Sequence, residues 1–420
     1  MSWDFSNAAL QQNIAFAEFG AEKESLRVTP DGLLAQTPHP FTEEYIDRDF
    51  CENQVEMITG VHDNVDSLID ELEEIHRTVN AKLREMNELL WPFSNPPIVR
   101  SGDDIPIALF EGEQRERTEY RRYLAEKYGK AKMLFSGIHL NYSFSAGMLQ
   151  AAFAQSGGSD FDGFKDRAYL ELIRKLLQYN WLIVYLTAAS PIVDSSFARL
   201  HGIDRKDRYS YASVRCSEVG YWNDFLPLLD FTTLDSYCGS IRQYVDRGRL
   251  RSTTELYYPL RLKPRGKNSL DALRKNGVNH IELRCLDVNP LSEVGLFKED
   301  VRFIHLLILY LMSLPDRPLS KSDQRTAIEN SKTAALYDDA ENEIIKDGKR
   351  LPLKIAAEDV LFEIKRFAEQ NAPVFLPDLD HQLKKLSDRR YVETVRERFT
   401  DYIHDGITLA KNYLSFRGSD

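Results

Sequence analysis

The sequence predicts an α+β fold: an antiparallel β-sheet with one polar face, flanked by helices and followed by a helical C-terminal region. Several short segments alternate polar and apolar residues, which is the pattern of an antiparallel sheet with one face on a core. These segments are interleaved with helical patterns up to about residue 295, and from residue 296 onward the pattern is almost entirely helical. We therefore expect a mixed domain over residues 1–295 and a helical region over residues 296–420 that packs on it.

The first expected elements follow from local composition. Residues 3–17 are predicted to form a short helix. Residues 19–28 are β-prone and are closed by a turn signal, Thr29-Pro30-Asp31-Gly32. A second strand is expected near residues 49–59, and residues 65–90 carry apolar side chains at the spacing of a long amphipathic helix.

The chain after this helix continues the alternation of helices and strands. A proline-rich loop at 91–106 leads to a charged helix over 116–128, which Gly129 is expected to end. The segment 190–221 is rich in loop residues, and a basic linker at 264–268 joins two later strands. Further strands are expected at 133–144, 254–263 and 278–286, and further helices at 164–188 and 234–249.

The composition is that of a globular protein with a sizeable core: 420 residues, of which 43% are hydrophobic and 28% are charged. The net charge of -11 argues against nucleic acid or an anionic membrane as a partner. The N-terminus has no signal-peptide pattern, and the most apolar run, residues 303–312, is about half as long as a membrane span. We expect a cytoplasmic enzyme. The sequence does not specify its oligomeric state and is compatible with a monomer.

The polar faces of the strands carry unusual chemistry. Glu22 and Glu24 share one face of their strand, about 6.5 Å apart, where two carboxylates repel each other unless a cation or a proton intervenes. Taken alone, such a pair is typical of a solvated strand. Four other segments place these residues on one face: His139, Asn141 and Ser143; Glu255, Tyr257, Arg261 and Lys263; His280, Glu282 and Arg284; Phe50, Glu52, Gln54 and Glu56. Solvated faces usually carry Lys, Thr and Gln, so this concentration of acids, histidines and arginines favours a lined cavity.

A cavity with several carboxylates and a histidine suits a hard divalent cation such as Mg²⁺ or Mn²⁺. The four cysteines have no C-x-x-C spacing, which argues against zinc and against a disulfide framework. Neighbouring Arg and Lys side chains suit phosphate oxygens, and the combination is what phosphoryl transfer requires. The chain contains neither G-x-x-x-x-G-K-[ST] nor G-x-G-x-x-G, so we expect any nucleotide to be held by the sheet.

Several sequence blocks carry a family resemblance. They are GAEKESLR (20–27), DFCENQVEMIT (49–59), LAEKYG (124–129), SGIHLNYS (136–143), ASP (189–191), ELYYPLR (255–261) and IELRCLDVNP (281–290). Over about residues 19–303 the chain resembles glutamate–cysteine ligases, above all the ligase half of bifunctional glutathione-synthesising enzymes. The resemblance implies a glutamine-synthetase-like fold whose concave polar face holds Mg²⁺ and ATP. It also implies ATP-dependent ligation of the γ-carboxylate of L-glutamate to the amine of L-cysteine through a γ-glutamyl phosphate, the first step of glutathione biosynthesis.

The resemblance also implies roles for individual residues. The metal-binding set, for two or three Mg²⁺ ions, would be Glu22, Glu24, Asp49, Glu56, His139 and Glu282. Arg284 would stabilise the transferring phosphoryl group, Arg215 would bind substrate, and the phosphates of ATP would meet Arg261, with Lys263 and Arg265 as further candidates. The pocket for the acceptor cysteine would consist of Phe50, Tyr120, Leu124, Tyr221 and Tyr257. Strict alternation sets Asp49 opposite to Glu56, so its role requires a bulge or an earlier strand end.

Other functions remain open at this point. A ligase of the same chemistry could act on a different acceptor amine, a metal-dependent hydrolase could use the same groups, and a nucleotide sensor could keep the fold without catalysis. The sensor is disfavoured because every metal-binding acid and Arg284 are present. The chain stops at residue 420 with no second, ATP-grasp ligase domain, so we expect it to make the dipeptide only. For Cys51 and Cys285, a role as small hydrophobic residues is favoured over redox control.

Overall fold

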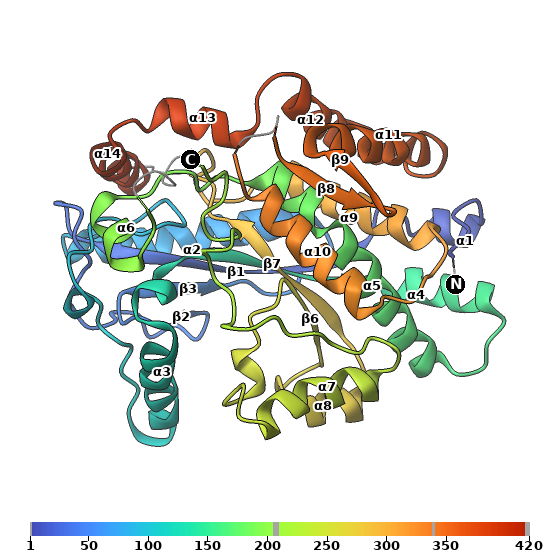
Figure 1. Cartoon of the computed structure of the whole chain (residues 1–420), viewed down its shortest axis with the longest axis horizontal. Helices are drawn as coiled ribbons and strands as arrows, with labels where there is room; N and C mark the ends of the chain where they lie inside the picture. Colours follow the sequence, from blue (N-terminus) through green and yellow to red (C-terminus); the bar gives the residue numbers. More distant parts are fainter. Residues whose placement is uncertain (1, 205–209, 338–340, 416–420) are drawn as a thin grey trace.

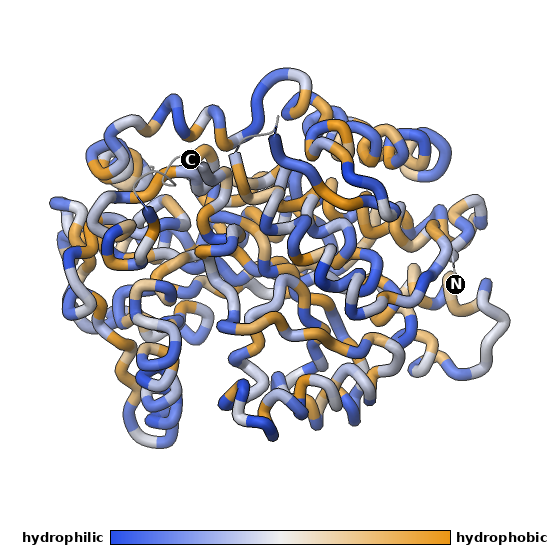
Figure 2. Tube along the Cα trace, in the orientation of Figure 1, coloured by the Kyte–Doolittle hydropathy of each residue, from blue (hydrophilic) through white to orange (hydrophobic). Residues whose placement is uncertain are grey.

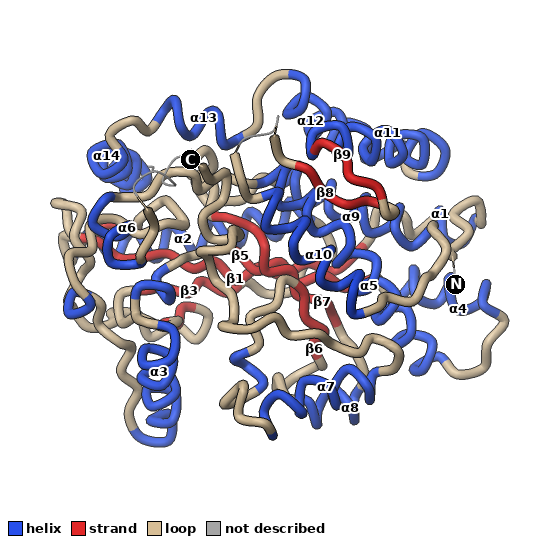
Figure 3. The backbone as a smooth tube through the Cα atoms, in the orientation of Figure 1, coloured by secondary structure: helices blue, strands red, loops and turns tan. Residues whose placement is uncertain are grey.

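The computed structural model describes residues 2–204, 210–337 and 341–415. At its centre is a seven-stranded sheet whose neighbouring strands pair antiparallel (Figure 1). The strands are β1 Ala17–Val28, β2 Ile46–Arg48, β3 Gln54–Ile58, β4 Leu89–Leu90, β5 Gly137–Phe144, β6 Leu260–Lys263 and β7 His280–Asp287. Their order in space is β2-β3-β1-β5-β7-β6, and β4 pairs with the end of β1. Figure 3 shows the strands at the centre and helices around them, so the predicted α+β class is confirmed.

Helices flank the sheet and make up most of the C-terminal region. They are α1 Ala8–Gln11, α2 Val65–Glu85, α3 Arg115–Tyr128, α4 Ala146–Ser156, α5 Phe161–Thr187, α6 Ser195–His201, α7 Leu234–Asp246, α8 Leu270–Asn276, α9 Lys298–Ser313, α10 Lys321–Ala334, α11 Leu353–Asn371, α12 Leu376–Ser387, α13 Tyr391–Arg398 and α14 Tyr402–Ser415. A hairpin of β8 (Glu343–Lys346) and β9 (Lys349–Pro352) interrupts this helical region. Asn64 and Asp160 begin α2 and α5 by accepting backbone N–H groups of the first turn.

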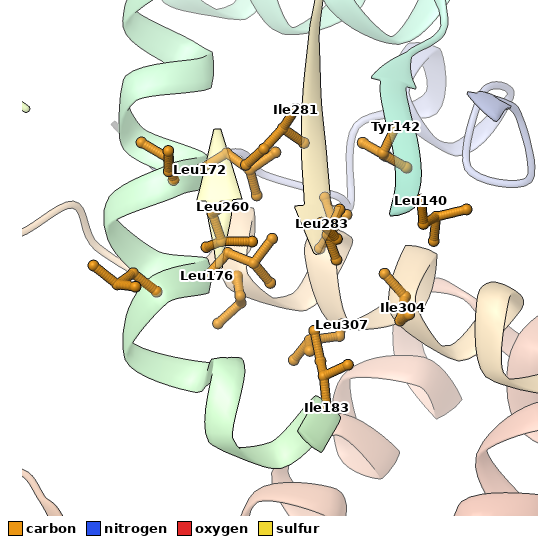
Figure 4. Close-up of a cluster of buried hydrophobic side chains, with 14 of the residues drawn as sticks. Leu140, Tyr142, Leu172, Leu176, Ile183, Leu260, Ile281, Leu283, Ile304 and Leu307 are labelled. Atoms are coloured by element: carbon orange, nitrogen blue, oxygen red, sulfur yellow. The ribbon is translucent and has the colours of Figure 1, made fainter. Parts of the chain in front are cut away.

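The apolar face of the sheet is buried against helices. Leu140 on β5 and Leu283 on β7 pack in one cluster with Leu176 of α5 and Leu307 of α9, as Figure 4 shows. At the other end of the sheet, α2 covers β3 through a cluster that includes Val55 and Leu72. These helices leave the opposite, polar face of the sheet to line the site described below. Side chains of α9, which follows residue 295, pack in the same hydrophobic cluster as the sheet. The domain boundary expected at residue 295 stays a prediction.

Two further groups of helices lie near the two edge strands of the sheet, β2 and β6. In Figure 1, α3 projects at the lower left beside β2 and β3, while α7 and α8 lie at the lower right beside β6. Figure 2 shows α3 as largely hydrophilic, in keeping with its exposed position. None of the helices in the described part of the chain is long and apolar enough to cross a lipid bilayer.

The predicted helix over residues 3–17 is wrong in extent. Only Ala8–Gln11 is helical, and β1 already begins at Ala17. The apolar residues Trp3 and Phe5 are buried in the main core, and the backbone N–H of Trp3 donates to the Met312 carbonyl at 2.9 Å. This segment is therefore held by contacts with the end of α9 rather than by a local helical pattern.

Four predicted elements are shorter than expected because turns interrupt them. The strand over 133–144 starts only at Gly137, because residues 131–134 form a 3₁₀ turn. The strand over 49–59 starts only at Gln54, and β2 before it was not predicted. The strand over 254–263 starts at Leu260, because residues 253–255 form a 3₁₀ turn. The helix over 65–90 ends at Glu85, where Asn87 has a left-handed φ of 55° and leads the chain into β4.

Candidate active site

A row of polar side chains crosses the sheet on its polar face. In the strand register Glu24 lies opposite Glu56, and Glu22 lies opposite His139. Glu282 on β7 lies opposite Asn141 on one side and opposite Arg261 on the other. Because alternate residues of a strand share a face, these five strands direct their polar groups toward one another.

Arg284, two residues after Glu282 on β7, belongs to the same row and lies at a bulge. The pairing of β5 with β7 shifts between Ile138 and Leu140, so that two residues of β7, Arg284 and Cys285, lie beside His139. As a result Arg284 Nη1 lies 3.2 Å from Glu282 Oε2 and 3.3 Å from His139 Nδ1.

Asp49 reaches the same site because it lies outside the strands, between the end of β2 and the start of β3. Strand alternation required either a bulge or an earlier strand end, and the structure has the earlier strand end. Residues 49–53 form a turn, in which the Asp49 N–H donates to the Gln54 carbonyl at 3.1 Å. Glu52, expected on the polar face, turns away instead. Its carboxylate accepts the backbone N–H groups of His39 and Leu109 at 2.8 and 2.9 Å and binds Arg48 at 2.9 Å.

These groups surround a cavity of about 190 Å³. The cavity brings together fourteen of the predicted residues: Glu22, Glu24, Asp49, Phe50, Glu56, Tyr120, Leu124, His139, Tyr221, Tyr257, Arg261, Lys263, Glu282 and Arg284. Arg121, Met133 and Thr254 also line it and were not in the predicted set. Arg121 lies beside Tyr120 on α3 and donates to the Asp49 carbonyl. The helix that carries Arg121 was predicted. The hydrogen bond from Arg121 to the carbonyl of Asp49 could not be predicted, because no sequence pattern indicates a contact between residues so far apart.

The acids of the cavity have strongly perturbed pKa values. Burial, reinforced by Asp49, raises the pKa of Glu24 to about 8, although Arg215 and Arg284 oppose the shift. Burial and the neighbouring carboxylates raise the pKa of Glu56 well above its usual value. Burial also works against the charge of Glu282, but Arg284, Lys263 and Arg261 together hold its pKa well below the usual value. One half of the site therefore has an excess of negative groups, and the other half has a surplus of cations.

The acid-rich half fits a divalent cation. Ligand atoms of Glu22, His139 and Glu282 lie within 4.8 Å of one another. Among the described residues the buried His139 Nε2 has no hydrogen-bond partner, and Glu24 Oε1 lies 3.6 Å from it. A buried ring nitrogen without a partner, among carboxylates that would repel one another, is a suitable donor set for Mg²⁺ or Mn²⁺.

The cationic half is formed by β6 and β7. Lys263 Nζ lies 2.9 Å from Glu282 Oε1, and Arg261 Nε lies 4.0 Å from Glu282 Oε2. The Arg261 guanidinium also donates to the Leu256 carbonyl and, at 3.0 Å, to the Thr254 carbonyl. Arg265 is exposed on the loop after β6 and is not among the residues that line the cavity, so its role stays a prediction.

Arg215 lies beside the main cavity. Together with Tyr221, Tyr257 and Arg284 it lines an adjoining cavity of about 40 Å³. Its guanidinium donates to the Arg284 carbonyl at 2.8 Å. It also fills the space over Gly137, where an added Cβ would lie 2.2 Å from Arg215 Cζ. Glycine at this position is therefore required for Arg215 to lie against the sheet.

The remaining wall contains the aromatic rings of Phe50, Tyr120, Tyr221 and Tyr257. The ring of Tyr221 lies 4.3 Å from that of Tyr257, and behind the wall the ring of Tyr128 lies 5.5 Å from that of Tyr257. Cys51 and Cys285 are buried nearby, and burial raises the pKa of both thiols, so neither is a reactive thiolate.

Comparisons with known proteins agree in sequence and in fold. A sequence model of the glutamate–cysteine ligase family matches residues 4–249 and 243–334. The "Glutathione biosynthesis bifunctional protein GshAB" of Listeria innocua is 38% identical over 344 residues, covering 79% of this chain and 44% of that protein. The "Glutamate--cysteine ligase" of Clostridium acetobutylicum is 31% identical over 437 residues, covering 91% of this chain and 89% of that protein. The chain thus spans about half the length of the bifunctional relatives that it matches.

Two solved structures have the same fold. A bifunctional glutathione synthetase from Pasteurella multocida superposes with a TM-score of 0.84 at 27% identity, covering 97% of this chain and 53% of that chain. A glutamate–cysteine ligase from Francisella tularensis, solved in complex with AMP, superposes with a TM-score of 0.86 at 23% identity, covering 96% of this chain and 90% of that chain. The second likeness bears on the fold alone.

Proposed function

The chain belongs to the glutamate–cysteine ligase family, and on that premise we propose that it forms γ-glutamylcysteine from L-glutamate, L-cysteine and ATP. The γ-carboxylate of glutamate attacks the γ-phosphorus of ATP, the bond from this phosphorus to the bridging oxygen breaks, and ADP leaves. The cysteine amine then attacks the carbonyl carbon of γ-glutamyl phosphate and forms the C–N bond, while the C–O bond to phosphate breaks, phosphate leaves and one N–H proton of the amine passes to the solvent. The observation that carries this proposal is the convergence of acids, cations and an aromatic wall on one cavity.

We assign the metal site to Glu22, His139 and Glu282, with Glu24, Asp49 and Glu56 as ligands for further ions. When bound, Mg²⁺ or Mn²⁺ would screen the negative charges of the ATP phosphates. Between the two ends of the row, Glu282 can bridge the metal half and the cationic half, since it also contacts Lys263 and Arg284.

Arg284 is the proposed electrostatic catalyst of phosphoryl transfer. Burial opposes its charge, but Glu282, Tyr221 and Glu24 raise the pKa of Arg284 above its usual value, so it stays cationic. Its guanidinium is fixed between Glu282 and His139 before any substrate arrives. A cation held in place in this way needs no reorganisation when charge builds up on the transferring phosphoryl group.

The substrates are assigned to the two sides of Arg284. Arg215, in the adjoining cavity, is the proposed partner of a glutamate carboxylate, while Arg261 and Lys263 are the proposed partners of nucleotide phosphates. The acceptor amine is assigned to the wall formed by Phe50, Tyr120, Leu124, Tyr221 and Tyr257. Aromatic rings suit the small polarizable side chain of cysteine.

The test is an assay of ADP release with purified protein, Mg²⁺, ATP, glutamate and a panel of acceptor amines. We expect turnover to require both glutamate and an acceptor, with cysteine preferred and γ-glutamylcysteine identified by mass. ADP release without glutamate would indicate a hydrolase. A higher kcat/KM for 2-aminobutyrate or a bulkier amine would keep the chemistry and replace cysteine as the acceptor.

A further inference from the structure

Glu255 is a buried carboxylate that the proposed chemistry does not use. Its sequence pattern predicted a place on the polar face of the sheet, but it lies in a 3₁₀ turn ahead of β6 and has an exposure of 0%. Within the described part of the chain it is not among the residues that line the cavity. A carboxylate buried to this extent requires several partners, and these partners connect separate segments of the site.

The carboxylate of Glu255 holds the C-terminal half of α3. Its Oε1 accepts from Lys127 Nζ at 2.6 Å, from the Tyr128 hydroxyl at 2.7 Å and from the Tyr123 hydroxyl at 3.3 Å. Its Oε2 accepts the backbone N–H of Arg251 at 2.6 Å. This group of bonds ties the C-terminal end of α3, which projects from the sheet in Figure 1, to the segment ahead of β6.

The backbone around Glu255 is joined to a third segment through Asn223. The Asn223 amide donates to the Glu255 carbonyl at 2.8 Å and to the Tyr128 hydroxyl at 3.0 Å. The Asn223 side-chain oxygen accepts the backbone N–H of Tyr257 at 2.9 Å. Glu255, Asn223 and Tyr128 therefore form one hydrogen-bonded junction.

Each segment of this junction carries part of the acceptor wall. Tyr120 and Leu124 lie on α3, the helix that ends at Tyr128. Tyr221 lies two residues before Asn223, and Tyr257 lies two residues after Glu255. A displacement of the junction would therefore move these side chains relative to one another while leaving the acids of the sheet in place.

We propose that Glu255 is a positioning residue that sets the shape of the acceptor pocket by tying α3, the Asn223 loop and the Tyr257 loop together. This inference rests on the proposed ligase function for the identity of the acceptor. Glu255 acts through Tyr120, Leu124, Tyr221 and Tyr257 and touches no reacting atom. Its loss should weaken acceptor binding more than the binding of ATP or glutamate, because four residues of the acceptor wall depend on the junction, whereas Arg261 and Arg215 keep their own backbone partners.

The test is Glu255→Gln, which keeps the shape of the side chain and removes its charge. We expect the KM for cysteine to rise about tenfold or more. The charge-assisted bond from Lys127 is lost, and the new amide NH₂ group would face N–H and O–H groups that are themselves hydrogen-bond donors. The KM values for ATP and glutamate should rise by a clearly smaller factor, about threefold or less, and kcat at saturating cysteine should stay within about twofold. Tyr128→Phe, which removes a single hydroxyl, should raise the KM for cysteine by a smaller factor.

Asp300→Asn is the matched control. Asp300 and Lys385 form another buried ion pair, at 2.6 Å, which joins α9 to α12 away from the cavity. This variant should lower thermal stability by a similar amount and leave the KM for cysteine unchanged. If Glu255→Gln does not fold, Tyr128→Phe and Lys127→Met decide the question.

The outcomes separate this inference from the function on which it rests. A wild-type protein without glutamate-dependent and acceptor-dependent ADP release would overturn the proposed function. An active wild type whose Glu255 and Tyr128 variants leave the KM for cysteine unchanged, or raise all three KM values by the same factor, would overturn the role of Glu255 alone.

Discussion

Replacement of Arg284 by alanine should slow the reaction and leave the fold intact. Removing one preorganised donor from a developing charge costs about 10²–10³-fold in kcat, or about 2.7–4 kcal/mol. The full effect is expected because the guanidinium is held at 3.2 Å from Glu282 and 3.3 Å from His139 with only 13% of its side chain exposed. The backbone bonds of Arg284 survive the change, since its N–H donates to Pro259 and its carbonyl accepts from Arg215.

The assay is steady-state ADP release at saturating ATP, glutamate and cysteine, with thermal unfolding measured on the same samples. Arg284→Lys should give an intermediate rate, because lysine keeps the charge and loses the fixed fork of donors. Arg302→Ala is the control, since Arg302 lies on α9 and binds Asp66 at 2.5 Å outside the cavity. A folded Arg284→Ala protein with kcat within about threefold of wild type would refute the electrostatic role.

The remaining predictions concern the metal site and the glutamate site. Gly137→Ala should destabilise the protein by about 1–3 kcal/mol through overpacking. It should also raise the KM for glutamate, because the added Cβ would lie 2.2 Å from Arg215 Cζ and displace the guanidinium. An unchanged KM for glutamate would exclude Arg215 from glutamate binding. Burial, reinforced by Asp49, raises the pKa of Glu24 from 4.5 to about 8, so the stability that its bound proton contributes is complete below pH 4.5 and is lost as the pH rises through about 8 in metal-free protein. Mg²⁺ should restore this stability and release protons at neutral pH, which calorimetry in two buffers of different ionisation enthalpy measures; binding without proton release would contradict the assignment. Glu24→Gln should flatten the pH dependence and raise the Mg²⁺ concentration for half-maximal activity, and a normal metal titration would exclude Glu24 as a ligand.

The residues of the sheet face could be predicted because strand alternation is a local rule. Glu22, Glu24, His139 and Glu282 share one face in the structure as their period of two requires. Arg284 also reaches this face, although the bulge beside it could not be read from the sequence.

Residues in turns were the ones that pattern reasoning misplaced. Glu52 and Glu255 have the alternation of strand residues, yet each lies in a turn whose shape depends on distant partners. Glu52 is held by the backbone N–H groups of His39 and Leu109, and Glu255 by the side chains of α3. Buried carboxylates are placed by their donors, and donors that come from separate segments have no spacing that a single sequence displays.

Anomalous diffraction from Mn²⁺, in crystals grown with a non-hydrolysable ATP analogue, would test the proposed metal site directly. We expect at least one Mn²⁺ ion ligated by Glu22, His139 and Glu282, with the phosphates of the analogue on the side of Arg261 and Lys263. Crystals that hold the nucleotide with no Mn²⁺ among these acids would contradict this assignment.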